Sequence, residues 1–334
     1  METRKVQRTG KSTFIVSLPK NWAVKNDIQP GSLIYITQSE NGSLVLSPDR
    51  SERVLSARLD IGDKVGDPLV RDIIGCYVSG YRTIEVVSPH MTATQKKDVH
   101  QIVQKLIGPE ILEETVNKVF IQDLIDPEEL QSERALRRIK TVVRSMVMDA
   151  IEALANNDKE LAEDVVQRDD DVDRLNLLIS RQFTEILRSG SLKRDALNPI
   201  VAFNYSRAAT NLERMADHAA WIAKIVTMHD CDLSPEFSEK MNDIKPIFVD
   251  LIEESISALL KLDSDRANKI IDTSRATRDS VTQDILNSTL DVGEEEETLL
   301  RLVVSSIERM LHYIKNISEL TINLTQMGAE FEAK

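Results

Sequence analysis

Cysteine and long apolar runs are both scarce in this 334-residue chain. Its two cysteines, Cys76 and Cys231, lie far apart and outside any CxxC pair, which argues against a disulfide framework and a zinc ribbon. No run of about 18 apolar residues occurs, and the first ten residues, METRKVQRTG, lack the apolar core of a signal peptide. We therefore expect reduced thiols, no membrane insertion and a cytoplasmic location.

Aromatic residues and glycine-rich loops are also sparse. Aromatics make up 4% of the chain against 41% hydrophobic residues in all, a balance that favours aliphatic helix bundles over β-sandwiches. The 11 glycines form neither GxGxxG nor GxxxxGK, so no phosphate-binding loop is predicted. No nucleophile stands beside a general base, and carboxylate clusters without histidine are uncommon for hydrolytic zinc. The sequence thus disfavours a metal-dependent hydrolase and indicates a protein that is not an enzyme.

The net charge of −13 is unevenly distributed. Residues 1–50 hold seven basic and four acidic side chains, a balance of +3, so the other 284 residues carry −16. Only the N-terminal segment is suited to bind a polyanion, because the acidic remainder repels nucleic acid and attracts cations.

The first fifty residues predict three or four short strands around one helical turn. Apolar runs at 14–18, 33–36 and 44–46 read as strands, with Asn41-Gly42 as the turn before the third run, and 19–31 reads as a helical turn between prolines. A segment of this size cannot bury a core alone, so we expect it to intertwine with a second copy.

The order and residues of RKVQRTGKSTFIVSLPKNWAVKNDIQPGSLIYI resemble the AbrB/MazE/SpoVT family of swapped-hairpin domains. The resemblance implies a basic first strand, SLPK before a short helix, and then a second hairpin. In that family the dimer presents basic residues to DNA, where lysine and arginine neutralise phosphates and arginine also pairs with guanine. The resemblance implies a homodimer and a DNA-binding surface made of Arg4, Lys5, Arg8, Lys11 and Lys20. The alternative is a dimerisation module with an ordinary charged rim.

Residues 51–125 predict a small α+β domain. The order is a strand at 52–60, a helix at 68–81, a strand at 82–89, a helix at 92–108 and a closing hairpin. We expect Thr92 to begin the second helix and Gly108 to end it. His90 and His100 have no partner at metal-ligand spacing. The segment shows no catalytic motif, which leaves a spacer, a dimer contact or a small-ligand sensor open.

From residue 127 onward the pattern is helical. Six helices are expected at about 127–156, 159–189, 195–229, 235–262, 264–290 and 295–327, in two groups of three that indicate an internal duplication. Short connections force antiparallel neighbours, so each group should be an up-down-up bundle. We divide the chain into domains 1–50, 51–125, 126–230 and 231–328.

The third helix combines an apolar seam with a carboxylate pair. Leu212, Met215 and Ala219 step by three and four, while Glu213 and Asp217 lie one turn apart and point away from that seam. Asp169 and Asp173 repeat the spacing in the preceding helix. Four carboxylates on two antiparallel helices suit divalent or ferric ions, and without a metal their repulsion should raise at least one pKa. A solvated acidic face, partnered by Arg214 or Lys224, predicts the same spacing.

DDxVDxL followed by NLERMADHAxxIA resembles the PhoU family of phosphate-uptake regulators over residues 127–327, as a tandem three-helix repeat. The resemblance implies all-α bundles whose (E/D)xxxD motifs assemble iron or zinc clusters. Carried over, it assigns the metal to Asp169, Asp173, Glu213 and Asp217. In the second repeat Glu308 is kept, but His312 replaces an aspartate. The preceding helix offers Arg275 and Asp279, or Ser274 and Arg278 if the alignment slips by one.

Two residues beside the motif and one loop complete the candidates. His218 and Trp221 either contact a partner or pack against a neighbouring helix, and 229–232 is either a metal tract or a polar turn. The whole chain predicts a DNA-binding transcriptional regulator of phosphate homeostasis whose PhoU-like half senses or relays phosphate supply. The alternative is an accessory protein that docks on a phosphate transporter ATPase or a sensor kinase, with the N-terminal domain only dimerising.

Overall fold

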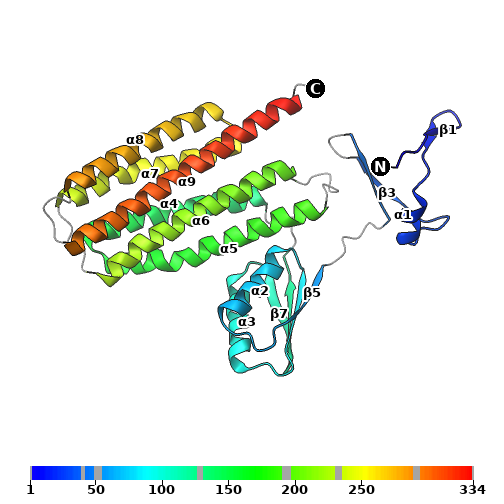
Figure 1. Cartoon of the computed structure of the whole chain (residues 1–334), viewed down its shortest axis with the longest axis horizontal. Helices are drawn as coiled ribbons and strands as arrows, with labels where there is room; N and C mark the ends of the chain where they lie inside the picture. Colours follow the sequence, from blue (N-terminus) through cyan, green and yellow to red (C-terminus); the bar gives the residue numbers. More distant parts are fainter. Residues whose placement is uncertain are drawn as a thin grey trace. The chain divides into compact units, whose positions relative to one another are not determined.

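The computed structural model describes residues 2–38, 42–48, 55–125, 131–189, 197–229, 235–288 and 294–332 (Figure 1). They form two compact units, one from the N-terminal segment and one that begins at Leu55. The second unit contains both the α+β segment and the helices. Among the helices of the described residues, none contains an apolar stretch of the length that a membrane span requires.

The N-terminal unit consists of two hairpins and a short helix. β1 (Gln7–Thr9) pairs with β2 (Thr13–Ile15), α1 (Lys20–Lys25) follows, and β3 (Tyr35–Gln38) pairs with β4 (Leu44–Ser47). The apolar runs do not indicate β1, because the residues QRT are polar, but the basic first strand implied by the AbrB/MazE/SpoVT resemblance corresponds to it. Asn41 of the predicted turn lies outside the described residues. The strands and helix expose large apolar side chains, namely Phe14, Ile15, Val16, Val24, Leu33, Ile36 and Leu44.

The α+β segment forms a four-stranded sheet with two helices. β5 (Ser56–Asp60), β6 (Thr83–Val87), β8 (Lys118–Asp123) and β7 (Pro109–Glu114) pair in that order, and only β5 and β6 are parallel. Alternate strand residues such as Ile84, Val86 and Ile121 are buried together with residues of α2 (Asp67–Val78) and α3 (Ala93–Lys105). The predicted α+β architecture is therefore correct, although residues 52–54 of the first predicted strand lie outside the described chain.

The two predicted ends of α3 have different outcomes. Thr92 forms a capping box, in which its hydroxyl accepts from the Gln95 backbone N–H and the Gln95 side chain accepts from the Thr92 N–H. Gly108 does not end the helix, which stops at Lys105. Gly108 instead precedes β7 with φ +104, and a Cβ there would lie 2.4 Å from Oδ1 of Asp123. Close approach to β8 explains this glycine.

Beyond the α+β segment, the described residues of the second unit form six long helices (Figure 1). Two groups of three share one apolar core, with α4 packed on α7 and α6 on α9. The sequence predicted every helix, and α9 continues five residues past its expected end because Gly328 is accommodated inside it. The helices are α4 (Ser132–Asn156), α5 (Lys159–Ser189), α6 (Pro199–Met228), α7 (Pro235–Lys261), α8 (Ser264–Ser288) and α9 (Glu294–Glu332).

The turns within the two groups confirm the duplication in atomic detail. Asn157 and Leu262, 105 residues apart, both have left-handed backbones, with φ of 49° and 56°. Each precedes an aspartate whose Oδ1 caps the next helix: Asp158 accepts from the Leu161 N–H and Asp263 from the Arg266 N–H. The same turn geometry thus joins α4 to α5 and α7 to α8.

Candidate functional site

The carboxylates of α5 and α6 meet between the two helices. On α5 the buried side chains Val172 and Ile179 turn Asp169 and Asp173 toward the surface beside α6. The antiparallel course of the two helices then sets Asp173 against α6, and carboxylate oxygens of Asp173, Glu213 and Asp217 lie within 4.8 Å of one another. Asp169 stands one turn before Asp173 on α5.

None of these four carboxylates forms an ion pair or hydrogen bond within the described parts of the chain, and the buried Oδ1 of Asp169 lacks a partner. Arg214 and Lys224, the partners that a solvated acidic face would supply, form no ion pair with them. Arg214 instead lies 6.0 Å from the ring of Tyr313. The cluster is consequently a concentration of negative charge that the nearby Arg214 and Lys224 offset only in part.

This environment raises the pKa of all four carboxyl groups. Desolvation by the surrounding helices is the largest cause in every case, although the residues Asp173 and Asp217 are exposed by surface area. Repulsion from neighbouring carboxylates adds to it for Asp169, Asp173 and Glu213. The pKa of Asp173 rises to about 6 and that of Glu213 to about 7. The predicted increase in pKa is present, although burial contributes more to it than the repulsion we had anticipated.

The donor set suits a hard or borderline cation. Carboxylate oxygens are ligands for divalent and ferric ions, and a cation would replace the missing partners of Asp169 and remove the repulsion. Histidine and cysteine are missing from the group of residues whose ligand atoms converge within the described chain. The residues present therefore fit a metal held by oxygen.

The second repeat does not reproduce this arrangement. The shared turns relate α5 to α8 by 105 residues, which aligns Ser274 and Arg278, rather than Arg275 and Asp279, with the aspartate pair of α5. Arg278 pairs with Asp279 at 2.8 Å, and Glu308 accepts a hydrogen bond from Thr282 at 2.6 Å.

His312 is exposed and contacts the ring of Tyr313. Within the described residues, Asp279, Glu308 and His312 do not converge on a common point. The second repeat lacks the carboxylate cluster because Ser274 and Arg278 occupy the positions that correspond to Asp169 and Asp173.

The five basic residues predicted to contact DNA are all exposed. Arg8 lies on β1 and donates to the backbone oxygen of Lys11 in the β1–β2 turn, where Gly10 has φ +68. Arg4 and Lys5 directly precede β1, and Arg4 pairs with Glu2. Lys20 begins α1. The hairpin thus brings Arg8 and Lys11 together at its turn.

The residues flanking the carboxylate motif have separate surroundings. His218 is half-buried between α6 and α9, with its ring 5.9 Å from that of Tyr313, and burial lowers its pKa. Trp221 remains 43% exposed on the outer side of α6. His229 ends α6, and residues 230–232 of the predicted tract lie outside the described chain.

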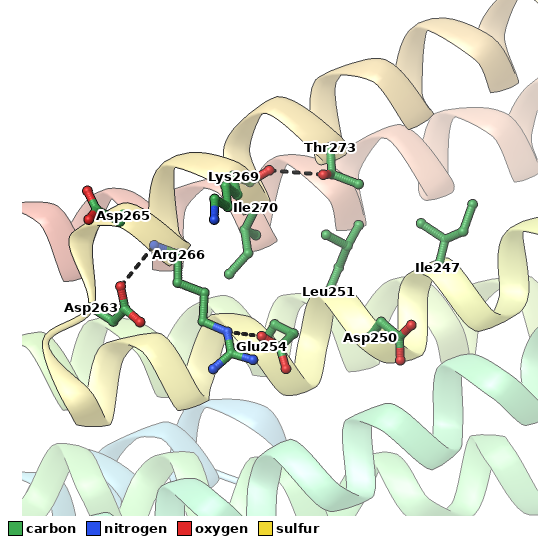
Figure 2. Close-up of a pocket in the computed structure, with 10 residues that line it drawn as sticks. All are labelled: Ile247, Asp250, Leu251, Glu254, Asp263, Asp265, Arg266, Lys269, Ile270 and Thr273. Atoms are coloured by element: carbon green, nitrogen blue, oxygen red, sulfur yellow. Dashed lines mark hydrogen bonds and ion pairs between the residues drawn. The ribbon is translucent and has the colours of Figure 1, made fainter.

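A shallow groove between α7 and α8 lies apart from the carboxylate cluster. Figure 2 shows Arg266 across it, with its side chain paired to Glu254 and its backbone N–H donating to Asp263. Acidic and basic side chains line it together with Ile247, Leu251 and Ile270. None of the predicted site residues lies in this groove.

Arg181 of α5 was missed by the sequence reading. Its side chain is 3% exposed and reaches from the helical bundle into the α+β segment. The available signal was a lone arginine in the apolar line of α5, two residues beyond Ile179, but the sequence gives no indication of which segment receives it.

Two sequence families match the chain. The PhoU domain matches residues 136–226, and the family described as antidote-toxin recognition MazE, bacterial antitoxin, matches residues 7–54. The first match covers α4 to α6 with all four carboxylates, and the second covers the N-terminal hairpins.

Relatives and solved structures agree with the first match. The phosphate-specific transport system accessory protein PhoU homologue of Clostridium acetobutylicum is 26% identical over 219 residues, which is 62% of this chain and 94% of that protein. Its counterpart in Pseudomonas aeruginosa is 22% identical over 191 residues, 55% of this chain and 78% of that protein.

The crystal structure of PhoU from Pseudomonas aeruginosa superposes with a TM-score of 0.51 at 21% identity, over 58% of this chain and 95% of that one. PhoU from Streptococcus pneumoniae gives 0.50 at 20% identity, over 60% of this chain and 95% of that one. At these identities the structures show the fold alone, which is the tandem helical fold described above. The chain therefore carries an N-terminal domain of the MazE/AbrB type, followed later in the sequence by a PhoU domain.

Proposed function

We propose that this protein is a non-enzymatic, DNA-binding regulator of phosphate homeostasis. The observation that carries the proposal is the union, in one chain, of a MazE-type segment at residues 7–54 with a PhoU domain at residues 136–226. A protein that only serves a transporter gains nothing from a basic DNA-binding module. The charge distribution supports this, because residues 1–50 carry +3 in a chain of −13.

In the proposed complex two copies pair through their N-terminal hairpins. The exposed apolar side chains of β2, β3 and β4 support this pairing, since a second copy would cover them. Arg4, Lys5, Arg8, Lys11 and Lys20 of both copies then neutralise DNA phosphates. Each such contact releases counterions, so the affinity falls steeply as salt increases.

The helical half is proposed to receive the signal through a metal. Asp169, Asp173, Glu213 and Asp217 hold a divalent or ferric ion, of which iron and zinc are the candidates, and the unpartnered Oδ1 of Asp169 supports this assignment. Binding of the metal, phosphate or a protein partner favours one of two arrangements that differ in their DNA affinity.

Genome-wide DNA occupancy under phosphate starvation and plenty tests the function. We expect discrete sites near phosphate-uptake genes whose occupancy changes with supply. In vitro, fluorescence anisotropy with one such site should give an affinity that decreases with salt. Flat salt dependence together with no enriched sites in cells would exclude DNA binding.

The second candidate is an accessory protein that docks on a phosphate transporter ATPase or a sensor kinase. It is favoured by the relatives, which are named as transport accessory proteins and match most of their length to this chain. Retention of DNA by the wild-type chain, and its loss when Arg8 and Lys11 become alanine, would separate the two candidates.

A further inference from the structure

One buried arginine joins the α+β segment to the helix that carries Asp169 and Asp173. The Arg181 guanidinium pairs with Oδ2 of Asp123 on β8 at 2.8 Å, where the two side chains are 3% and 9% exposed. Its Nη1 donates to the backbone oxygens of Tyr77 and Tyr81 at 2.7 and 3.0 Å. The same guanidinium lies 4.8 Å from the ring centroid of Tyr77.

The neighbouring side chains extend this joint. The Tyr77 hydroxyl donates to the Ile107 oxygen at 2.9 Å, which ties the end of α2 to the segment before β7. Leu177 of α5 packs on the α+β core, while Ile107 packs on the helical core. A Cβ on Gly80, whose φ is +81, would lie 3.2 Å from Cγ of Glu185, so glycine permits the close approach to α5.

A second, weaker contact lies beside the carboxylate cluster. Nζ of Lys105, the last residue of α3, pairs with Oδ1 of Asp170 at 2.8 Å, and both side chains are more than half exposed. Asp170 follows Asp169 directly and precedes Arg181 by 11 residues, about 16 Å along the helix. Solvent-exposed pairs contribute little stability, whereas removing one partner of a buried pair is costly. The α+β segment is thus fixed to α5 at one end and loosely held at the other.

We infer that residues 55–125 are a relay that pivots on Arg181 in response to the charge of the carboxylate cluster. Arg181 holds the segment to α5 in both states. A bound cation offsets the negative charge of Asp169 and Asp173 and repels the Lys105 ammonium, which weakens the pair of Lys105 with the neighbouring Asp170 and releases the end of α3. In the chain this segment directly follows the MazE-type domain. A change in the orientation of residues 55–125 therefore acts on the DNA-binding domain that is covalently attached to them. The pivoting step depends on the proposed metal site, whereas the joint at Arg181 does not.

Hydrogen exchange on the full-length protein tests the joint. Arg181→Met should speed amide exchange in residues 77–83 and 118–123 by about tenfold or more while leaving α7–α9 unchanged. Arg168→Met is the matched control, because Arg168 lies on the same helix and pairs with Asp149 of α4 at 2.7 Å. Unchanged exchange at 77–83 in the Arg181 variant, or an equal effect in the control, would overturn the joint.

Two milder variants keep the test decisive if Arg181→Met does not fold. Arg181→Lys keeps the charge but loses the planar fork, and Asp123→Asn keeps the two carbonyl partners. Both should produce smaller increases in exchange confined to the same peptides. An increase spread over all helices, or none in these peptides, would overturn the joint.

Titration with Zn²⁺ and with Fe²⁺ tests the relay. Metal should speed exchange at 99–105 in the wild-type protein, and Lys105→Met should show that faster exchange without metal and no further response. In Arg181→Met the metal should still bind by calorimetry, and exchange at 77–83 should be fast both with and without it. No binding heat in the wild type would reject the metal site and leave the joint intact. Binding with unchanged exchange at 99–105 would reject the relay.

Discussion

At the scale of single residues, the carboxylate cluster makes stability depend on pH in an unusual direction. A carboxyl group with a raised pKa in the folded state binds its proton more tightly there than in the unfolded chain. Stability therefore falls as pH rises from the ordinary pKa toward the folded one. For Glu213 this window runs from 4.5 to about 7, and for Asp173 from 3.8 to about 6. The carboxylate cluster should thus contribute more to the stability of the metal-free protein at pH 5 than at pH 8, against the smaller opposite effect of the lowered His218 pKa.

Glu213→Gln should stabilise the metal-free protein at pH 8, because glutamine carries no charge to desolvate. We expect a gain of about 1 kcal/mol, less than 1.4 kcal/mol per pKa unit would give, because solvent screens a half-exposed group. The gain should disappear near pH 4, where the glutamate is protonated in both states. Thermal unfolding followed by circular dichroism between pH 4 and pH 8 measures it. Asp171→Asn, on the exposed side of α5, is the control and should show no such pH-dependent gain.

Adding metal should reverse the effect of the same substitution. A bound cation stabilises the folded state by mass action, and Glu213→Gln removes one of its ligands. With excess Zn²⁺ at pH 7.5 the wild-type protein should unfold at the higher temperature, and chelation should restore the original order. If the glutamine variant remains the more stable protein in metal, the carboxylates are a solvated face rather than a site.

The sequence predicts the residues of the carboxylate cluster but not the contacts of Arg181. The spacing of four within α5 and α6 predicts two carboxylate pairs, because helical periodicity alone fixes which residues share a face. The partners of Arg181 could not be predicted in this way. They lie on β8 and at the end of α2, and which side of that segment faces α5 depends on packing between elements that are distant in sequence.

At the scale of elements, the two equivalent turns differ in how well their residues suit a left-handed backbone. Asparagine tolerates positive φ, so Asn157 is well placed, whereas Leu262 has a branched apolar side chain that is strained there and 44% exposed. The turn of the second repeat thus stores strain that the first avoids.

Leu262→Gly should therefore stabilise the protein by about 1 kcal/mol, since glycine adopts φ of 56° without steric cost. Asn157→Gly is the matched control and should not give this gain, because asparagine already tolerates positive φ. Chemical unfolding of the helical transition measures both. Equal effects at the two turns would show that the leucine side chain contributes packing that offsets its strain.

The elements themselves were predictable where periodicity runs over many turns. All six long helices were found because their apolar seams repeat across 25 residues or more in each. Periodicity did not indicate β1, because its three residues are polar, and only the family resemblance implied a strand there. Gly108 was assigned to a helix end because a sequence does not show that Asp123 lies against it. The long helices could therefore be predicted from local sequence patterns, whereas the short elements depend on contacts between residues that are distant in the sequence.

At the scale of the whole molecule, the DNA affinity of the basic N-terminal unit should decrease as the salt concentration rises. Arg8→Ala should weaken binding by about the same factor for different DNA sequences wherever Arg8 contacts only phosphate, because such a contact does not read the bases. In a dimer it should also reduce the slope of log K against log salt by about 2, one contact per copy. Lys25→Ala is the control, because Lys25 is exposed at the end of α1 and outside the predicted surface. Anisotropy titrations at several salt concentrations would contradict the assignment if both variants behaved alike.

The same N-terminal unit should also determine the oligomeric state. Its strands expose Phe14 by 70% and Ile36 by 63%, and none of the residues in β1, β2 or α1 is buried, so the unit gains a core only from a second copy. Ile36→Lys places a charge in that shared core and should convert a dimer into a monomer. The helical signal in circular dichroism should be unchanged, because α4–α9 bury their own core.

Val116→Lys is the matched control, since Val116 is 70% exposed in the β7–β8 turn of the other unit. Light scattering after size exclusion measures both variants. A dimer that survives Ile36→Lys but not Val116→Lys would move the interface from the hairpins to the α+β segment, and with it the expected spacing of the basic residues.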